Sequence, residues 1–591
     1  MSNKETRINN SATSFDIKLI KRLFRYMIKY SPLIIISVVL LLLLNGAGVV
    51  QPYLIKIGID ENVMTGDIEG LKSLSLLLFS IIFVAFGLNF FFNYLVQYIG
   101  QKLLMDLRMD LFKHVLKLPN SYFDRTPVGK TLTNITNDVE AIRAFISEGV
   151  VTVVGELLKV IFILTAMFMI NFRLALLTLI SIPVFVIGTF LFRNSIRKGF
   201  AGVRKANSEI NTSLVETITG IKEIILFDHK SKSRDRFDVS NKSYLSAYLK
   251  VINAYSLYFP IIEIVSNISM VVVFFYAHSI VGQSIRVGEI FAFFTYINMF
   301  FRPLRELAEK FNMFQSAMAA SERAFKLLDR DITIHSIPNS IKSEQRIGGK
   351  IEFKNVNFEY NDGDRILKDV TFSIGKGEKI ALVGNTGSGK TTIINLINRI
   401  YEVRDGSVLI DDRDIKDYNL EYLREQVGVV PQDPFFFNGS IYENLSLFKP
   451  NLSGERVKRC SERVHADSFI HKFDHGYDEQ VLEEGKKLSS GQRQLLSFTR
   501  ALIKDPSIII LDEATSNIDS ETESFIEDAT RKLLGDRTSI IIAHRLSTIK
   551  MVDRIIVLKD GKVVEEGDHS TLISKKGEYF NLYQSQSFLL K

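Results

Sequence analysis

The sequence predicts a multidomain membrane protein with two parts: an N-terminal all-α transmembrane domain of six spanning helices, and a C-terminal α/β domain built around a phosphate-binding loop. Three observations support this division. The long apolar segments end near residue 311, long charged helical connections join several of them, and a glycine-rich phosphate loop follows residue 383. A chain of 591 residues is also too long for one ordinary domain.

Six segments in the first half are long and apolar enough to be candidate membrane spans. A helix rises 1.5 Å per residue, so crossing a ~30 Å hydrocarbon core takes about 20 residues. The candidates are residues 32–50, 74–96, 150–170, 174–192, 255–277 and 290–311. The last is the weakest, because Arg302, Arg305 and Glu306 interrupt it. The alternative, buried helices of a soluble protein, is disfavoured because most of these segments contain no charge.

Charges flanking the first span predict the orientation of the chain. The basic residues before the span are Lys18, Lys21, Arg22, Arg25 and Lys29, and the acidic residues after it are Asp60, Glu61, Asp67 and Glu69. Because basic flanks stay inside, we expect residues 1–31, which include an amphipathic helix, to lie in the cytoplasm. We expect the C-terminal domain to lie there too. The chain is thus predicted to be a multi-pass protein of the cytoplasmic (inner) membrane. The net charge of +7 fits membrane lipids better than nucleic acid, because no aromatic-basic recognition motif accompanies it.

The connections between spans are very unequal in length. Those predicted outside are short, at 171–173 and 278–288, whereas the inner ones, at about 101–147 and 197–254, are long and helical in periodicity. They predict helices that continue well below the membrane, with one turn at 120–129.

Few ionisable residues lie inside the predicted spans. Glu156 and Lys159, three apart, are expected to pair. Glu263 is either a substrate contact or a helix-to-helix hydrogen-bond partner.

A phosphate-binding loop follows an apolar strand at residues 379–383 and precedes an apolar helical stretch. Its residues are Gly384, Asn385, Thr386, Gly387, Ser388, Gly389, Lys390, Thr391 and Thr392. Glycines let backbone N–H groups surround phosphate oxygens, Lys390 reaches the outer phosphates, and the Thr391 hydroxyl ligates Mg²⁺. The strand–loop–helix context makes a chance match improbable.

A second apolar strand, 507–511, ends in Asp512 and Glu513. Alone, two acids after a strand could mark the point where the strand meets solvent. Together with the phosphate loop, they indicate that Asp512 holds Mg²⁺ and that Glu513 polarises the attacking water.

Between these motifs lies a third, Leu488, Ser489, Ser490, Gly491 and Gln492, which resembles the signature of ATP-binding cassette (ABC) proteins. Other elements of that family follow in the expected order. Tyr360 matches the adenine-stacking aromatic, Gln432 the Q-loop glutamine, Ser516 and Asp519 the D-loop, and His544 the switch histidine.

The first half resembles bacterial exporter-type ABC half-transporters, which include multidrug exporters and lipid flippases. The motif at 122–129 and the segment 321–328 carry this likeness, which covers about residues 18–585. It implies a cytoplasmic N-terminal segment at 1–31, a transmembrane domain at 32–317, a linker at 318–348 and a nucleotide-binding domain at 349–585. It also implies coupling helices near 120–129 and 216–227.

The resemblance implies an ATPase that exports or flips amphipathic small molecules, drugs or lipids, with ATP and Mg²⁺ bound. Lys390, Glu513 and His544 would be catalytic, Thr391, Gln432 and Asp512 would hold Mg²⁺, and Ser489 and Gly491 would contact ATP held by a partner chain. A nucleotide-gated channel or regulatory subunit is the alternative, against which the intact Glu513 argues.

The signature departs from the family pattern at Ser490, where a glycine is usual. A β-carbon where backbone approaches phosphate weakens that contact. This favours a heterodimer, in which the partner half-transporter supplies an intact signature. Serine is small, however, and a working homodimer stays open.

Overall fold

A computed structural model describes residues 17–280, 286–338, 340–343, 345–360, 363–447, 449, 452–482, 485–512, 520–542 and 546–588. The chain divides into two compact units. The helical unit comprises Met1–Val115 and Gly129–Asp329, and the α/β unit comprises Leu116–Val128 and Arg330–Lys591. The short insertion at Leu116–Val128 therefore belongs with the C-terminal part of the chain, although it lies within the helical half of the sequence.

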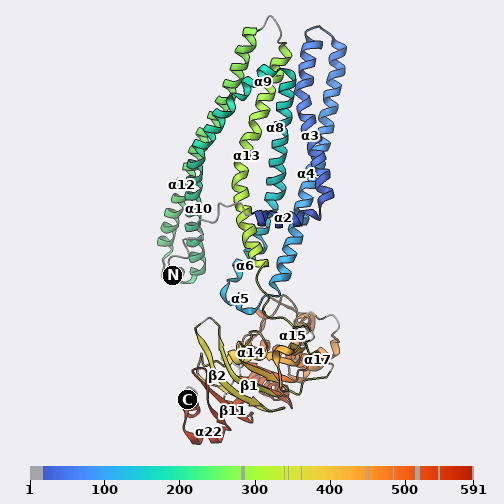
Figure 1. The fold of residues 1–591 in the computed structure, drawn as a ribbon. Helices are drawn as coiled ribbons and strands as arrows, with labels where there is room; N and C mark the ends of the chain where they lie inside the picture. The colour runs from blue at the N-terminus through green and yellow to red at the C-terminus, as the bar shows by residue number, and fades with distance from the viewer. Residues whose placement is uncertain are drawn as a thin grey trace. The chain divides into compact units, whose positions relative to one another are not determined.

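The helical unit consists of α-helices with two short π-helical segments among its described residues (Figure 1). Its elements are α2 (Ile17–Ile28), α3 (Ser31–Ile57), η1 (Gly58–Val63), α4 (Ile68–Val115), α6 (Val128–Ile135), α7 (Asn137–Ala144), η2 (Phe145–Val150), α8 (Val151–Ile170), α9 (Phe172–Leu179), α10 (Ser181–Thr219), α11 (Ile221–Leu226), α12 (Lys230–Ile280) and α13 (Val287–Leu328).

Each of the six predicted spans falls on helix. Four helical stretches in the described part of the chain are long and apolar enough to cross a membrane: Ser31–Val63, Ile68–Val115, Val128–Ile170 and Lys230–Tyr276. The fourth predicted span corresponds to a shorter apolar stretch, Phe172–Val184, and the sixth lies on the charge-bearing α13. Crossing by these last two segments stays a prediction.

The helices are far longer than a bilayer requires. Helix α4 has 48 residues and α12 has 51, which at 1.5 Å per residue gives about 72–77 Å, more than twice a ~30 Å hydrocarbon core. The predicted extension of the spans is therefore confirmed. Helix α13 also continues to Leu328, so the first part of the 318–348 segment predicted as linker is a continuation of the last helix.

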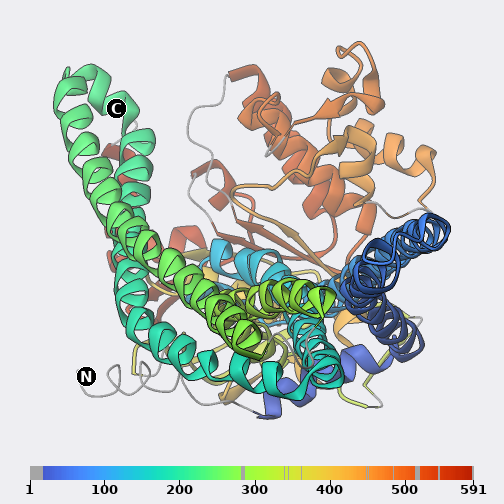
Figure 2. The same cartoon turned by 90° about the horizontal axis from the view of Figure 1, so that it is seen from above.

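The core of the helical unit lies where α8 and α13 pack together. Phe293, Tyr296 and Ile163 are fully buried there, and the Tyr296 hydroxyl donates to the carbonyl of Val49 on α3 at 2.6 Å. The predicted pair Glu156 and Lys159 has its charged atoms 4.0 Å apart. Helices α10 and α12 pack along each other as a separate pair, seen in green in Figure 2.

The α/β unit contains two main sheets. One is antiparallel in the order β2-β1-β4-β5, and the other has the order β12-β11-β3-β10-β9-β6, with all neighbours parallel except β11 and β12. The strands are β1 (Ile351–Glu359), β2 (Arg365–Ile374), β3 (Lys379–Val383), β4 (Asp405–Ile410), β5 (Arg413–Asp414), β6 (Val427–Val430), β7 (Gly439–Ser440), β8 (Gln480–Val481), β9 (Ile508–Asp512), β10 (Thr538–Ile542), β11 (Arg554–Lys559) and β12 (Lys562–Gly567).

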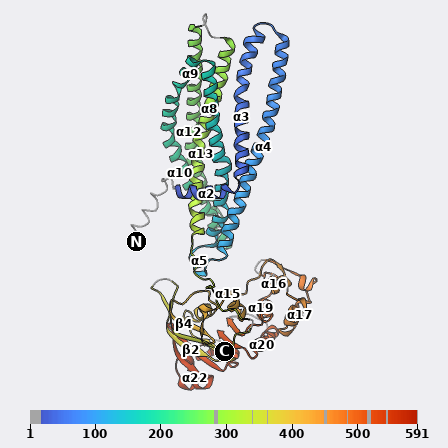
Figure 3. The same ribbon diagram turned by 45° about the vertical axis from the view of Figure 1, so that its right-hand side comes forward.

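Helices cover the parallel sheet, and those of residues 441–534 form a helical side beside the strands (Figure 3). The helices of this unit are α5 (Asn120–Arg125), α14 (Lys390–Ile397), η3 (Ile415–Asp417), α15 (Leu420–Gln426), α16 (Ile441–Ser446), α17 (Gly454–Arg463), α18 (Asp467–Ile470), η4 (Gly476–Asp478), α19 (Ser490–Lys504), α20 (Ser520–Leu534), α21 (Leu546–Ile549), α22 (His569–Lys575) and α23 (Glu578–Phe588). The predicted fold class, helical first and α/β second, is confirmed.

Candidate nucleotide site

The phosphate loop joins β3 to α14 at the carboxyl end of a central strand. The strand is buried, and the loop needs two glycines with left-handed backbone, Gly387 at φ +84° and Gly389 at φ +105°. A β-carbon at Gly389 would lie 2.6 Å from the Cδ2 atom of Leu367. Both conformation and space therefore require glycine at position 389.

Lys390 begins α14 and reaches back over the loop. Its Nζ atom donates to the carbonyl oxygens of Gly384 at 2.7 Å and Asn385 at 2.9 Å. Burial lowers the pKa of Lys390, whereas the Asp512 carboxylate acts to raise it. A lysine ammonium has three donors, so one N–H beyond these two bonds is available to an anionic oxygen at the mouth of the loop.

The sheet order brings the second predicted motif to the same edge. Strand β10 lies between β3 and β9, with Ile542 level with both Leu382 and Asp512. Because parallel strands end at one edge, Asp512 meets the phosphate loop there. Gln432 follows β6, the neighbour of β9, and is exposed.

The three predicted Mg²⁺ ligands offer a hydroxyl, an amide carbonyl and a carboxylate oxygen. Mg²⁺ prefers such hard oxygen donors and keeps several waters, so the chemistry of Thr391, Gln432 and Asp512 fits this ion. The predicted catalytic pair Glu513 and His544, and the D-loop residues Ser516 and Asp519, lie outside the described residues.

Tyr360, the predicted adenine-stacking residue, is fixed beside the phosphate-loop helix. Its hydroxyl lies 3.1 Å from the Thr392 Oγ1 atom, and its ring meets Phe358 and Tyr401 edge-on, each with a centroid distance of 5.0 Å. These contacts set the orientation of the Tyr360 ring at the end of β1.

The signature residues form the start of α19. Ser489 is the N-cap, and its side chain accepts from the Gln492 backbone N–H while the Gln492 side chain accepts from the Ser489 N–H. This reciprocal cap fixes the helix entry. Leu488 is buried in the core, whereas Ser489 and Ser490 are exposed and Gly491 is buried.

Arg500, on the same helix, ties α19 to the segment after Gln432. It donates to the carbonyl oxygens of Asn444 and Phe435 at 2.8 and 2.6 Å, and its guanidinium lies 4.3 Å from the Phe436 ring centroid. Burial lowers the pKa of Arg500 to about 10. Sequence reasoning assigned Arg500 no role, because its partners lie more than fifty residues away along the chain.

A second contact missed from sequence joins helix α5 to the nucleotide side of this unit. The Tyr401 hydroxyl accepts from the Asn120 side chain at 2.6 Å and donates to Asp124, and Arg125 donates to the Tyr360 carbonyl oxygen at 2.9 Å. Helix α5 is therefore linked directly to Tyr360, the predicted adenine-stacking residue. The motif at 122–129 indicated a coupling helix, but no sequence signal identified Tyr401 as its partner.

Comparison with known proteins decides the family. Residues 34–304 match the family described as ABC transporter transmembrane region, and residues 367–516 match the family described as ABC transporter. The chain is 36% identical over 480 residues to a probable multidrug resistance ABC transporter ATP-binding/permease protein, YheH of Bacillus subtilis, covering 80% of this chain and 71% of that one. This chain belongs to the ABC transporter family.

Two further relatives indicate the export branch. An ATP-dependent lipid A-core flippase of Syntrophus aciditrophicus is 32% identical, with 96% of this transporter and 94% of the flippase covered. The solved structure of a bacterial Atm1-family ABC exporter with ATP bound matches with a TM-score of 0.78 and 25% identity, covering 94% of this chain and 98% of that one. The predicted family resemblance is confirmed.

These likenesses establish several coarse properties of the transporter. It is an ABC exporter with the exporter fold, it spans the membrane several times, and its C-terminal unit is an ATP-binding ATPase domain. It carries one membrane region and one ATPase domain, so it works as a half-transporter that pairs with another half. The predicted ATP-driven export is confirmed in this general form.

Proposed function

We propose that the transporter uses Mg²⁺-ATP to export or flip amphipathic molecules, drugs or lipids, across the cytoplasmic membrane. The proposed class of transported molecule rests on two relatives, one named as a probable multidrug resistance transporter and one as a lipid A-core flippase. The long apolar helices of the helical unit support it, since they provide a lipid-facing path for molecules with an apolar part.

The proposed roles in hydrolysis combine the geometry at the sheet edge with the sequence motifs. Lys390 and the backbone N–H groups of the loop bind the outer phosphates, and Tyr360 orients the nucleotide base. Thr391, Gln432 and Asp512 would hold Mg²⁺, which neutralises charge that develops on the phosphates. Glu513 polarises the attacking water and His544 steadies the γ-phosphate. Phosphoryl transfer depends mainly on positioning and electrostatics, so loss of one contact stops turnover without abolishing binding.

The proposed second half of each ATP site comes from the partner chain. Ser489 and Ser490 are exposed at the start of α19, and the start of a 15-residue helix favours an anion. We expect them to contact the γ-phosphate of ATP held by the phosphate loop of the partner. ATP then closes the dimer and opens the membrane path outward, and hydrolysis resets it.

The heterodimer proposal depends on Ser490. Ser490 is the first residue of α19, an ordinary helical position that is exposed. Serine tolerates that backbone conformation, so the argument for a weakened site rests only on the added side chain near phosphate. A heterodimer stays the proposal, and a homodimer is the outcome if that side chain is harmless.

Coupling between ATP use and transport is proposed to run through short helices. Helix α5 contacts Tyr401 and Tyr360. Helix α11 exposes Ile221 and Leu226, and Phe227 directly after it is also exposed. We propose that α11 docks this apolar surface on the ATPase domain of the partner. The basic residues before α3 support the proposal that the N-terminal segment and the ATPase domain both lie in the cytoplasm.

The test is reconstitution of the purified protein in lipid vesicles. ATP hydrolysis and ATP-dependent movement of a fluorescent lipid or drug across the bilayer are the expected results. A protein that stays monomeric with ATP bound and moves neither cargo would overturn the proposal. Hydrolysis without any cargo movement, together with ATP-gated ion conductance, would instead favour a channel or regulatory subunit.

A further inference from the structure

A groove runs between helices α10 and α12 of the helical unit, and no role in ATP binding or coupling accounts for it. Its upper part is a cavity of about 950 Å³, at the upper end of the size range of small-molecule sites. Its lower part is a smaller polar cavity of about 390 Å³. Lys205 and Glu209 line both cavities, so the two form one continuous groove.

Small residues form the floor of the groove and set the register of the two helices. Gly199 packs against Val251, where a β-carbon at Gly199 would lie 2.8 Å from the Val251 Cγ2 atom. A β-carbon at Gly202 would lie 3.7 Å from the Ala247 Cβ atom. The two helices run antiparallel, so Lys198 of α10 and Lys250 of α12 lie at similar positions along the groove. Lys205 lies seven residues beyond Lys198, about 10 Å farther along the same helix.

The groove changes character along its length. Its apolar end is lined by Leu191 and Phe192 of α10 and by Leu257 of α12, at the ends of the predicted fourth and fifth spans. Next come Lys198, Lys205 and Lys250, and no carboxylate of the described residues lies within 4 Å of these three ammonium groups. An apolar end followed directly by three cations matches an amphiphile with an anionic head.

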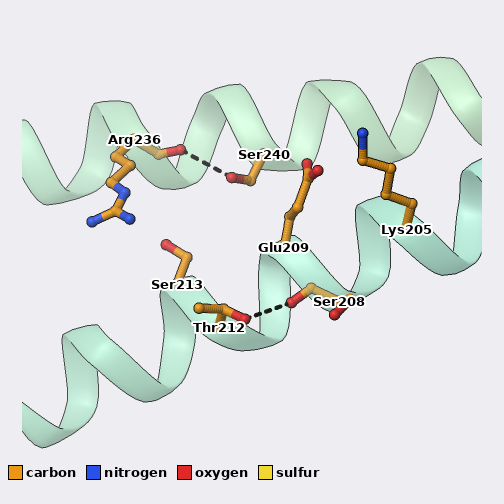
Figure 4. Close-up of a pocket in the computed structure, with 7 residues that line it drawn as sticks. All are labelled: Lys205, Ser208, Glu209, Thr212, Ser213, Arg236 and Ser240. Carbon is orange, nitrogen blue, oxygen red and sulfur yellow. Dashed lines mark hydrogen bonds between the residues drawn. The ribbon is translucent and has the colours of Figure 1, made fainter. Parts of the chain in front are cut away.

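The lower cavity is hydroxyl-rich (Figure 4). Thr212 donates to the Ser208 carbonyl oxygen at 3.0 Å and Ser240 donates to the Arg236 carbonyl oxygen at 3.4 Å, which leaves their hydroxyl oxygens as acceptors. The single lining carboxylate, Glu209, extends toward α12, and Arg236 pairs with Glu216 at 3.0 Å. This region suits the hydroxyl groups of a lipid head better than a second phosphate, which Glu209 would repel.

We propose that this groove binds an anionic phospholipid, with its phosphate between Lys198, Lys205 and Lys250, its acyl chain against Leu191, Phe192 and Leu257, and a hydroxylated headgroup toward the lower cavity. The inference rests on the membrane placement given under Proposed function. Each basic group near a membrane surface contributes about 1 kcal/mol toward an anionic lipid, about fivefold in affinity, so three contribute up to about 100-fold before screening.

The test titrates the purified, full-length dimer in detergent with phosphatidylglycerol, using native mass spectrometry. Phosphatidylcholine of the same acyl chains tests the charge, and glycerol phosphate tests the head without chains. The groove variant combines Lys198→Gln, Lys205→Gln and Lys250→Gln. The control combines Lys230→Gln, Lys232→Gln and Lys242→Gln on α12, which removes equal charge outside the groove.

The wild type and the control are expected to bind phosphatidylglycerol at least tenfold more tightly than phosphatidylcholine, and the groove variant is expected to lose this preference. A groove variant that keeps the preference, or a wild type that shows none, overturns the proposal. If glycerol phosphate competes for the groove as well as phosphatidylglycerol does, the proposed acyl-chain contact is overturned and the groove is a site for free phosphate compounds. ATP hydrolysis, measured on the same samples, reports on the proposed function separately.

Discussion

Leucine, isoleucine and phenylalanine are abundant in both units of the chain, but they lie in opposite places. In the α/β unit every residue of β10 is buried, and Ile540 and Ile541 are 0% exposed. In the helical unit, Phe79, Phe83 and Phe86 on α4 are 70–71% exposed. The same residue types therefore form a core in one unit and, in the other, the exposed surface of a helix that is long and apolar enough to cross a membrane. The difference teaches that apolar content alone does not define a core; the solvent around each unit does.

The largest expected effect is on the rate of ATP hydrolysis, with ATP binding retained. Glu513→Gln removes the proposed general base, and we expect ATP turnover to fall about 100-fold or more while ATP still binds. The measurement is phosphate release at saturating ATP, with binding followed by a fluorescent nucleotide. The matched carboxylate-to-amide control is Glu322→Gln on α13, which pairs with Lys326 at the surface. Undiminished turnover in Glu513→Gln would remove this residue from the mechanism.

A pair of truncations tests the contrast between core and lipid-facing surface. Ile541→Ala empties a buried site and is expected to cost about 2–5 kcal/mol of unfolding free energy, lowering the melting temperature of the α/β unit by about 4–20 °C. Phe83→Ala, on the exposed side of α4, is expected to shift stability by less than about 1 kcal/mol. Thermal unfolding in lipid nanodiscs checks both. Equal shifts would mean that α4 packs against protein rather than lipid.

A smaller effect is expected at the contact between Tyr401 and helix α5, which lie in the same unit. Tyr401→Phe removes two hydrogen bonds to α5, worth about 0.5–1.5 kcal/mol each. Basal ATP hydrolysis should stay within about twofold, whereas its stimulation by transported substrate should fall. Tyr442→Phe is the control, since that hydroxyl donates to the Leu452 carbonyl oxygen away from α5. Equal stimulation in both variants would deny this contact a coupling role.

The same contact has a defined pH dependence. Burial, and then the hydrogen bond to Asp124, raise the pKa of Tyr401 to about 12 from an ordinary value of 10. A raised folded-state pKa means that the stabilisation is complete below about pH 10 and is lost as pH rises toward 12. Protection of residues 120–125 from hydrogen exchange, corrected for the intrinsic rate, should thus be constant between pH 7 and 9. A fall in protection within that range would show that another group controls the contact.

The smallest expected effect concerns the signature helix. Ser490→Gly restores a glycine but costs about 1 kcal/mol or less of helix stability at an exposed first-turn position. If the serine impairs one ATP site, hydrolysis by the chain purified alone should rise severalfold. An unchanged rate, together with robust turnover by the wild type alone, would support a homodimer and remove the argument for a heterodimer.

Sequence alone determined the division of the chain, its family and the residues of the phosphate loop. Those features depend on local properties: the length of apolar segments, the strand–glycine–helix spacing around Gly384–Lys390, and the order of motifs along the chain. The capped start of α19 at Ser489 is also local, because Ser489 and Gln492 are only three residues apart.

Only the tertiary structure decided the rest. The pairing of Tyr401 with α5, the link from Arg500 to the segment after Gln432, and the groove between α10 and α12 join residues far apart in the chain. The continuation of α13 to Leu328 was also missed, because the family resemblance assigned residues 321–328 to the linker. Hydrogen bonds and packing between distant segments depend on how helices and strands are brought together, and one sequence carries no local signal for that.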